Sequence, residues 1–172
     1  TSANTIDKSD IKINGFDAFS VDFATDLSAS ATNTAKGIAD AINLNTGVHG
    51  AEVNAFNTFT SQAMGSFSMA ATFTLNSETV ALASSYTDLV TNINEAVSGV
   101  TATLNQDNTI TLSNTTGDDI IVNGGADVGF GGSTVTYTGF MEIKNLDGSG
   151  VQIEAGSVKN GYTSGVGKMA DL

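Results

Sequence analysis

The sequence predicts an α+β fold made of two small ββαββ units, each with a mostly antiparallel sheet covered by one helix. A duplicated segment is the main evidence, with copies at residues 11–53 and 73–104. Each copy opens with two segments in which apolar and polar residues alternate, as strands require. Each continues with a helical run that ends in Ile-Asn, and then with Gly-Val and a further alternating segment. A repeated unit of this size is typical of a building block.

In the first copy, Ile11 and Ile13 alternate with polar neighbours, and Asn14-Gly15 provides residues that tolerate positive φ. We therefore expect a hairpin. Its loop is expected to run from Asn14 to about Asp17, which is longer than a two-residue turn. The returning strand is expected to contain Phe19, Val21 and Phe23.

A helix is expected next, over Asp26–Asn45. Its apolar stripe consists of small residues at three- and four-residue steps: Ala31, Ala35, Ile38, Ala41 and Ile42. Thr32 or Asn33 is the expected N-cap and Gly47 the expected C-cap, with Val48 opening the next strand. One strand is expected over 51–56, and a second from Phe59 toward Phe67.

The second copy repeats this order. Phe73–Leu75 and Val80–Leu82 are expected to pair around a turn at Asn76-Ser77. The following helix is expected to begin at Ser85 or Thr87 and to end before Gly99. Its buried face is expected to consist of Tyr86, Leu89, Val90, Ile93 and Val97.

Strands are expected at 100–104, 110–112, 120–122 and 135–137, with turns at Asp107-Asn108 and Thr116–Asp119 and a loop at Gly124–Ser133. A C-terminal β-hairpin is expected, with its turn at Asp147–Gly150. We expect two subdomains, one formed by residues 1–66 together with 133–172 and one inserted between them at 67–132. A single merged domain is the alternative.

Composition excludes several classes of function. The 172 residues contain no cysteine, proline or tryptophan and carry a formal net charge of −12. This charge disfavours nucleic acids and anionic membranes as partners. No apolar run approaches the ~20 residues that cross a bilayer. The opening residues are polar and lack Met, so we expect the chain to be a piece of a longer protein.

No catalytic residue, metal ligand set or cofactor site is expected. The single histidine, His49, is expected to be an exposed turn residue. It cannot form a zinc site without further His or Cys ligands, and no serine lies in a Gly-x-Ser-x-Gly motif. Asp118-Asp119, Gly124–Asp127 and Asp147–Gly150 fit turns rather than calcium loops.

The duplicated unit resembles the repeat found in the variable, surface-exposed region of bacterial flagellins. The resemblance rests on the hairpin turns, on Ile42-Asn43 and Ile93-Asn94 at the helix ends, and on the Gly-Val segments that follow. The stretch Asn145–Gly156 is also similar to sequences near the end of that region. The long terminal helices that pack the flagellin core do not occur in this chain.

The resemblance implies a structural, extracellular role on the flagellar filament surface, in motility and antigenicity, and not an enzyme. Neighbouring flagellin subunits would be contacted through the missing helical core, so the isolated chain is expected to be monomeric. Antibodies or surface glycans are further expected partners. The alternative is an adhesin-like module for glycans or host surfaces, with Tyr86, Tyr137 and Tyr162 as candidates, although Tyr86 fits the core.

Glycosylation of the chain itself is a further expectation from the resemblance. Its candidate hydroxyls are Ser28, Ser30, Thr115 and Ser133. Asn114–Thr116 also fits an N-linked sequon, which is a short and frequent pattern.

Overall fold

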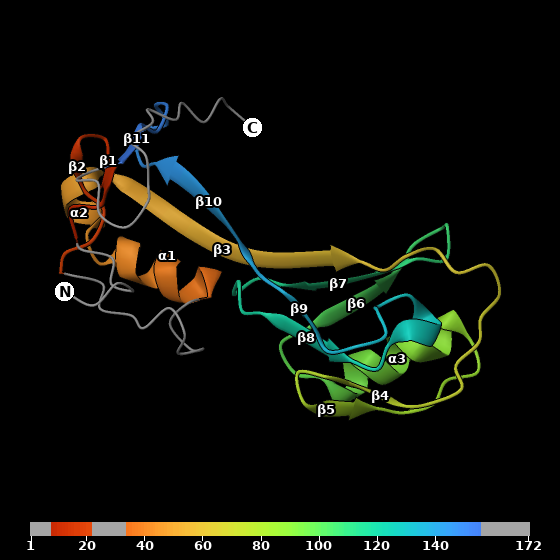
Figure 1. Ribbon diagram of the computed structural model, residues 1–172. Helices are drawn as coiled ribbons and strands as arrows, with labels where there is room; N and C mark the ends of the chain where they lie inside the picture. Colours follow the sequence, from red (N-terminus) through yellow and green to blue (C-terminus); the bar gives the residue numbers. More distant parts are fainter. Residues whose placement is uncertain (1–7, 22–33, 156–172) are drawn as a thin grey trace. The chain divides into compact units, whose positions relative to one another are not determined.

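The computed structural model of the chain describes residues 8–21 and 34–155 and has the predicted α+β fold. Three α-helices, one short 3₁₀ helix and eleven strands are defined in this part of the chain, and the strands form three sheets (Figure 1). The molecule divides into two compact units. Unit 1 comprises Thr1–Ala55 and Met141–Leu172, and unit 2 comprises Phe56–Phe140.

The boundaries between the units fall at residues 55/56 and 140/141, whereas the sequence predicts boundaries at 66/67 and 132/133. Strand β3 (Ala51–Thr60) runs through the first of these positions and β10 (Phe140–Asn145) through the second. The alternation of β3 continues unbroken across residue 55, so its sequence carries no boundary signal.

The first described strands of unit 1 form a hairpin whose turn is shorter than expected. Its strands are β1 (Ile11–Ile13) and β2 (Phe16–Asp17), and Ile13 pairs with Phe16. The turn is therefore the two residues Asn14-Gly15, with φ of 54° and 82°. Two successive positive φ values match the right-handed twist of the paired strands.

The expected returning strand is mostly replaced by a bend. Phe19 is buried there and Val21 is exposed, while Phe23 lies outside the described residues. Because β2 is short, Phe19 fills the core from a position outside the strand.

Helix α1 (Ala35–Asn43) begins later than its predicted start at Asp26. Thr34 caps it, and the Thr34 hydroxyl accepts a hydrogen bond from the Gly37 amide at 3.1 Å. The predicted caps Thr32 and Asn33, like the rest of 26–33, lie outside the described residues.

A second short helix, α2 (Thr46–His49), corrects the expectations for the segment after α1. Gly47 and Val48 lie inside α2, so Gly47 is not the C-cap and Val48 does not open a strand. Gly50 follows α2 with φ of 73° and lets the chain turn into β3.

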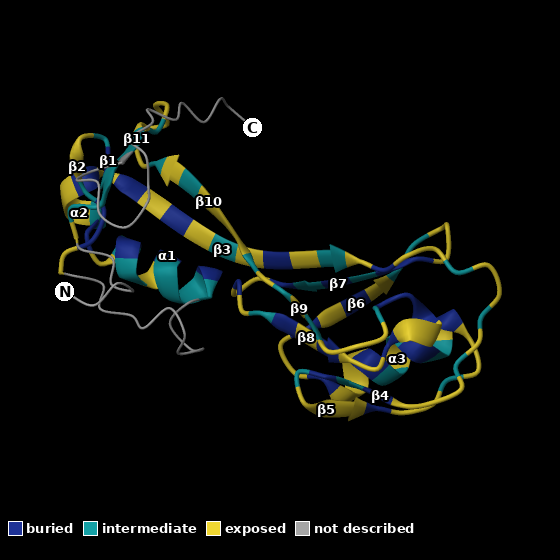
Figure 2. Cartoon of the chain, viewed as in Figure 1, coloured by how far each residue is buried: buried dark blue, intermediate teal, exposed yellow. Residues whose placement is uncertain are grey.

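The core of unit 1 is small and lies among β1, the bend, α1 and the start of β3. Figure 2 shows the buried positions alternating along β3 and recurring on one face of α1. The buried apolar residues of this core are Ile13, Ala18, Phe19, Ala39, Ile42, Ala51 and Val53.

The expected C-terminal hairpin does not form. The third sheet strand of unit 1, β11 (Ile153–Ala155), pairs with β1, in the order β11-β1-β2. Strand β10 instead neighbours β3 in the other sheet. The two strands that flank Asp147–Gly150 therefore belong to different sheets, although a turn does form there.

Unit 2 has the predicted ββαββ order, followed by two more strands. Its elements are β4 (Phe73–Leu75), β5 (Glu78–Val80), α3 (Tyr86–Ala96), β6 (Thr101–Leu104), β7 (Ile110–Asn114), β8 (Ile120–Asn123), the 3₁₀ helix η1 (Ala126–Val128) and β9 (Val135–Tyr137). Ser85 caps α3, as predicted, by accepting a hydrogen bond from the Asp88 amide at 3.1 Å.

The strands of unit 2 form two groups that share one core. One sheet has the order β5-β4-β8-β9, and in the other β3 pairs with β7 and β7 with β6. Helix α3 packs against β6 and β5 and so joins the groups. Phe59 continues β3, which ends at Thr60, rather than opening a separate strand toward Phe67.

The helix ends show that the two copies are equivalent in structure as well as in sequence. Asn43 at the end of α1 bonds both backbone groups of Val53 in β3, with Nδ2 to O and N to Oδ1 both at 2.8 Å. Asn94 in α3 forms the same pair of bonds with Ala102 in β6, at 3.0 and 2.7 Å. Each asparagine therefore attaches its helix to the following strand.

Candidate functional site

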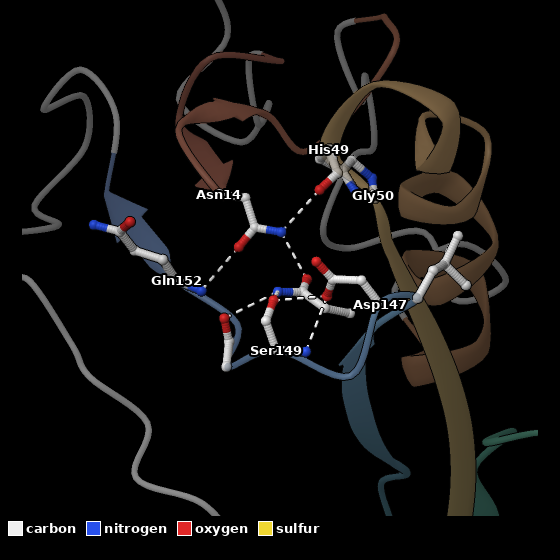
Figure 3. Close-up of a pocket in the computed structure, with 9 residues that line it drawn as sticks. Asn14, His49, Gly50, Asp147, Ser149 and Gln152 are labelled. Atoms are coloured by element: carbon white, nitrogen blue, oxygen red, sulfur yellow. Dashed lines mark hydrogen bonds between the residues drawn. The ribbon is translucent and has the colours of Figure 1, made fainter.

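An open polar depression of about 470 Å³ lies in the described part of unit 1 (Figure 3). It lies among the β1–β2 turn, the α2–β3 junction and the β10–β11 loop. Its lining residues are Asn14, His49, Gly50, Asn145, Leu146, Asp147, Ser149, Gly150 and Gln152.

Asn14 is at the centre of this depression and uses its whole side-chain amide internally. Its Nδ2 donates to the His49 carbonyl at 2.8 Å and to Asn145 Oδ1 at 2.6 Å. Its Oδ1 accepts from the Gln152 amide at 3.0 Å, and its own amide donates to the Gln152 carbonyl at 2.8 Å. The turn residue thus anchors the start of β11.

The β10–β11 loop is held by Asn145 and Asp147. Asn145 Nδ2 donates to the Gly150 carbonyl at 2.9 Å and to Ser149 Oγ at 3.0 Å. Asp147 Oδ1 accepts from the Ser149 hydroxyl at 2.7 Å and from the Ser149 amide at 2.9 Å. These bonds, the hydroxyl first, hold the pKa of Asp147 below its usual value of 3.8.

His49 is buried, with 2% of its surface exposed, and the expectation of an exposed turn residue is wrong. Nδ1 accepts from the Ala51 amide at 3.2 Å, so Nε2 carries the hydrogen that bonds the Ile42 carbonyl at 3.1 Å. Helix α2 turns the side chain inward. Both ring nitrogens bond backbone groups, so neither faces the depression as a base or ligand.

The same arrangement occurs in unit 2. The Asn76 amide donates to the Ile121 carbonyl and its Oδ1 accepts from the Ile121 amide, both at 2.8 Å. Asn114 and Asn145 precede Ile121 and Gln152 by the same seven residues. The polar groups of the depression therefore belong to a hydrogen-bonded framework that both units use. Their chemical role in this arrangement is to hold strands and turns together.

The sequon at Asn114–Thr116 is part of that framework. Asn114 is buried, its Nδ2 donates to the Asp118 carbonyl and its Oδ1 accepts from the Gly117 amide, each at 2.8 Å. An attached glycan would replace one of the two Nδ2 hydrogens and would need space where this amide is buried. Thr115 and Ser133 are exposed, whereas Ser28 and Ser30 lie outside the described residues.

The two tyrosines in the described ranges, Tyr86 and Tyr137, do not form an exposed sugar-stacking groove. Tyr86 is buried, as expected, and its hydroxyl donates to the Met64 carbonyl at 2.9 Å. Tyr137 stacks on Phe59 with ring centroids 3.5 Å apart, and its hydroxyl donates to the Phe130 carbonyl. Tyr162 lies outside the described residues.

Asp118 and Asp127 also bond other groups of the fold. Thr116 donates to the Asp118 carboxylate at 2.7 Å, and the Ala70 amide donates to the Asp127 carboxylate at 3.1 Å. In the described ranges, no three His, Cys, Asp or Glu side chains gather closely enough to hold a metal ion.

Sequence reasoning missed two features. One is that Asn14, Asn43 and their counterparts bond backbone groups of other strands. The signal for this role is that these asparagines recur in both copies. The other is an exposed aromatic pair, Phe56 and Phe140, with ring centroids 5.8 Å apart. Alternation along residues 56–60 places Phe56 on the outer face of β3, but its partner is distant in sequence.

Comparison of the chain with known protein families and with curated proteins gives no match. None of the helices in the described ranges has the length and apolar character that a membrane span requires.

Proposed function

We propose that this chain is a structural surface module of a flagellin-like filament subunit, exposed to the extracellular medium. The observation that carries the proposal is the framework shared by the two units. In both, asparagines at the hairpin turn and at the helix end bond backbone groups of other strands. Side chains used in this way serve to build a shape.

The pairing of β1 with β11 adds support. Ile11 lies opposite Ala155 in an antiparallel pair, so the two outermost described strands of unit 1 run side by side. A segment with this pairing can be carried by a longer chain without distorting it, because its two connections lie close together. Unit 2 is inserted between β3 and β10 of unit 1 in the same manner.

Charge and composition fit an outer position. A net charge of −12 keeps an exposed surface soluble and limits non-specific association. The absence of cysteine from the sequence leaves no thiol to cross-link neighbouring subunits in an oxidising medium.

Immunogold labelling of source cells with antibodies against the 172-residue chain tests the proposal. Gold along the whole length of the flagellar filaments is expected, and filaments without gold would overturn it. A second arm uses a single introduced cysteine as a reporter. Gln106→Cys in unit 2 is exposed and should react with a maleimide dye on intact filaments, whereas Ala102→Cys is buried and should react only after denaturation.

A further inference from the structure

The outer face of the β3–β7–β6 sheet in unit 2 carries an ordered set of hydroxyl side chains. Strand register places them in two rows that cross all three strands. The first row is Thr58, Ser113 and Thr101, and the second is Thr60, Thr111 and Thr103. We call these six residues the hydroxyl face.

The hydroxyl face is regular and open to solvent. Its side chains alternate with buried residues such as Leu112 and Ala102, so all six point away from the core. Neighbouring strands lie ~4.8 Å apart and alternate residues along a strand ~7 Å apart. Four of the six residues are exposed, while Thr111 and Ser113 on the central strand are half-buried.

Part of the hydroxyl face is already oriented by hydrogen bonds. The hydroxyls of Thr60 and Thr111 lie 2.9 Å apart, and Asn105 Nδ2 donates to Thr111 Oγ1 at 2.9 Å. Because Thr111 accepts from Asn105, its own hydrogen is free to be donated to Thr60 or to a ligand. Fixed hydroxyls lose less freedom on binding than rotating ones.

An aromatic pair adjoins the hydroxyl face. Phe56 precedes Thr58 by two residues and therefore lies on the same side of β3. Its ring stacks on that of Phe140, and the two residues are 40% and 53% exposed. Apolar rings beside an array of hydroxyls complement a sugar, which presents C–H faces and hydroxyl edges.

Charge decides the class of ligand. None of the six residues, and neither phenylalanine, is ionisable, although the chain as a whole carries −12. A cationic ligand would find no carboxylate among these side chains, whereas a neutral polyol needs none. We propose that the hydroxyl face and the Phe56–Phe140 pair bind a neutral, extended polysaccharide that lies along the sheet.

Cosedimentation of the full chain with microcrystalline cellulose and with chitin tests this proposal. Retention on at least one of them is expected, and retention should be unchanged in 0.5 M salt since no ion pair contributes. Phe140→Ala and Thr101→Asp should each weaken retention roughly tenfold. Thr79→Asp on β5 and Leu82→Ala are matched exposed controls in unit 2 and should retain full binding.

Three outcomes would overturn the proposal. The chain could remain in the supernatant with both polysaccharides. The control variants could weaken binding as much as the test variants do. Sedimentation velocity could instead show a dimer that Thr101→Asp disperses, which would assign the hydroxyl face to a second copy of the chain. Thermal melts of all four variants confirm that folding is retained, and none of these outcomes bears on the filament-surface proposal.

Discussion

Asn94 bonds both backbone groups of Ala102: its Nδ2 donates to the carbonyl at 3.0 Å and its Oδ1 accepts from the amide at 2.7 Å. This side chain substitutes for a neighbouring strand at the start of β6. Asn94→Ala removes the side-chain partners of the Ala102 amide and carbonyl, and Ala102 is buried. It should therefore lower the free energy of unfolding by about 1–3 kcal/mol. Urea denaturation measures the change.

Asn94→Asp is the more specific variant. The carboxylate keeps the acceptor for the Ala102 amide but places a second acceptor against the Ala102 carbonyl, so it should be at least as destabilising as Asn94→Ala. Asn123→Ala, at an exposed position of β8, is the control and should change stability by less than about 0.5 kcal/mol. Equal effects of the two alanine variants would contradict the role given to Asn94.

Exchanging the residue types at equivalent positions of the two hairpin turns should change stability in opposite directions. Ser77 has φ of 72°, and its counterpart in the first copy is Gly15 with φ of 82°. A left-handed conformation costs a residue with a Cβ about 1 kcal/mol. Ser77→Gly should therefore raise the melting temperature and Gly15→Ser should lower it, as measured by calorimetry. Changes of the same sign would show that side-chain contacts, rather than backbone conformation, decide these positions.

Replacing His49 should destabilise unit 1. His49→Ala removes the acceptor for the Ala51 amide and one of the donors to the Ile42 carbonyl, which keeps its bond from the Asn45 amide. It also leaves a cavity, so the total cost should be about 2–4 kcal/mol. Amide hydrogen exchange measured by NMR should show lost protection in α1 and the start of β3. Leu44→Ala, an exposed position nearby, is the control. An unchanged exchange pattern in unit 1 would disprove the structural role of His49.

The second copy was more predictable from sequence than the first for a local reason. In 73–104 the strand Phe73–Leu75, the Asn-Ser turn and the Ser85 cap are all encoded by near neighbours, and the structure confirms each of them. The returning strand is Glu78–Val80 and not the expected Val80–Leu82, because the two-residue turn lets pairing begin at Glu78, and Leu82 lies exposed beyond it. In the first copy, Gly47 predicts the end of a helix, whereas in the structure it lies inside the short helix α2. His49 was misread because a single histidine before a glycine has no local pattern that separates a turn from a buried position.

Pairing between distant strands accounts for what sequence did not reveal. The turn at Asp147–Gly150 was evident, but its flanking strands pair with β3 and β1, which lie about 90 and 140 residues earlier in the sequence. The hydroxyl face likewise requires the register of β3 against β7. Thr-x-Thr alternation in each strand shows that these hydroxyls share a face of their own strand, but not that the strands are neighbours.

Acid should weaken the fold partly through Asp107. The hydroxyl of Thr109 donates to Asp107 Oδ1 at 2.7 Å and its amide at 3.1 Å, and these bonds hold the pKa of Asp107 below its usual value of 3.8. Below pH 3.8 the unfolded chain takes up a proton that the folded chain resists, so stability falls as the pH drops through the folded pKa. Above pH 3.8 the contribution is complete.

Asp107→Asn tests this assignment, because an amide does not titrate in that range. Urea midpoints measured from pH 5 to pH 2 should fall less steeply for the variant than for the parent chain. Asp147, whose pKa is lowered in the same way by Ser149, should give the same result in unit 1. A parallel pair of pH profiles would contradict the role of the Thr109 bonds.

Gly129 marks the tightest backbone contact in unit 2. It has φ of 84°, and a Cβ there would lie 2.6 Å from the Gln62 carbonyl oxygen. The Gln62 amide also donates to the Gly129 carbonyl at 3.1 Å. Gly129→Ala must therefore separate two backbones as well as strain one. Gly99 has a similar φ of 79° but open space around it. Gly99→Ala should cost about 1 kcal/mol from conformation alone, and Gly129→Ala about 3 kcal/mol or more. The difference between the two variants in urea denaturation isolates the contact between residues 62 and 129. Equal costs would show that the 61–72 segment can move away from residue 129 without a loss of stability.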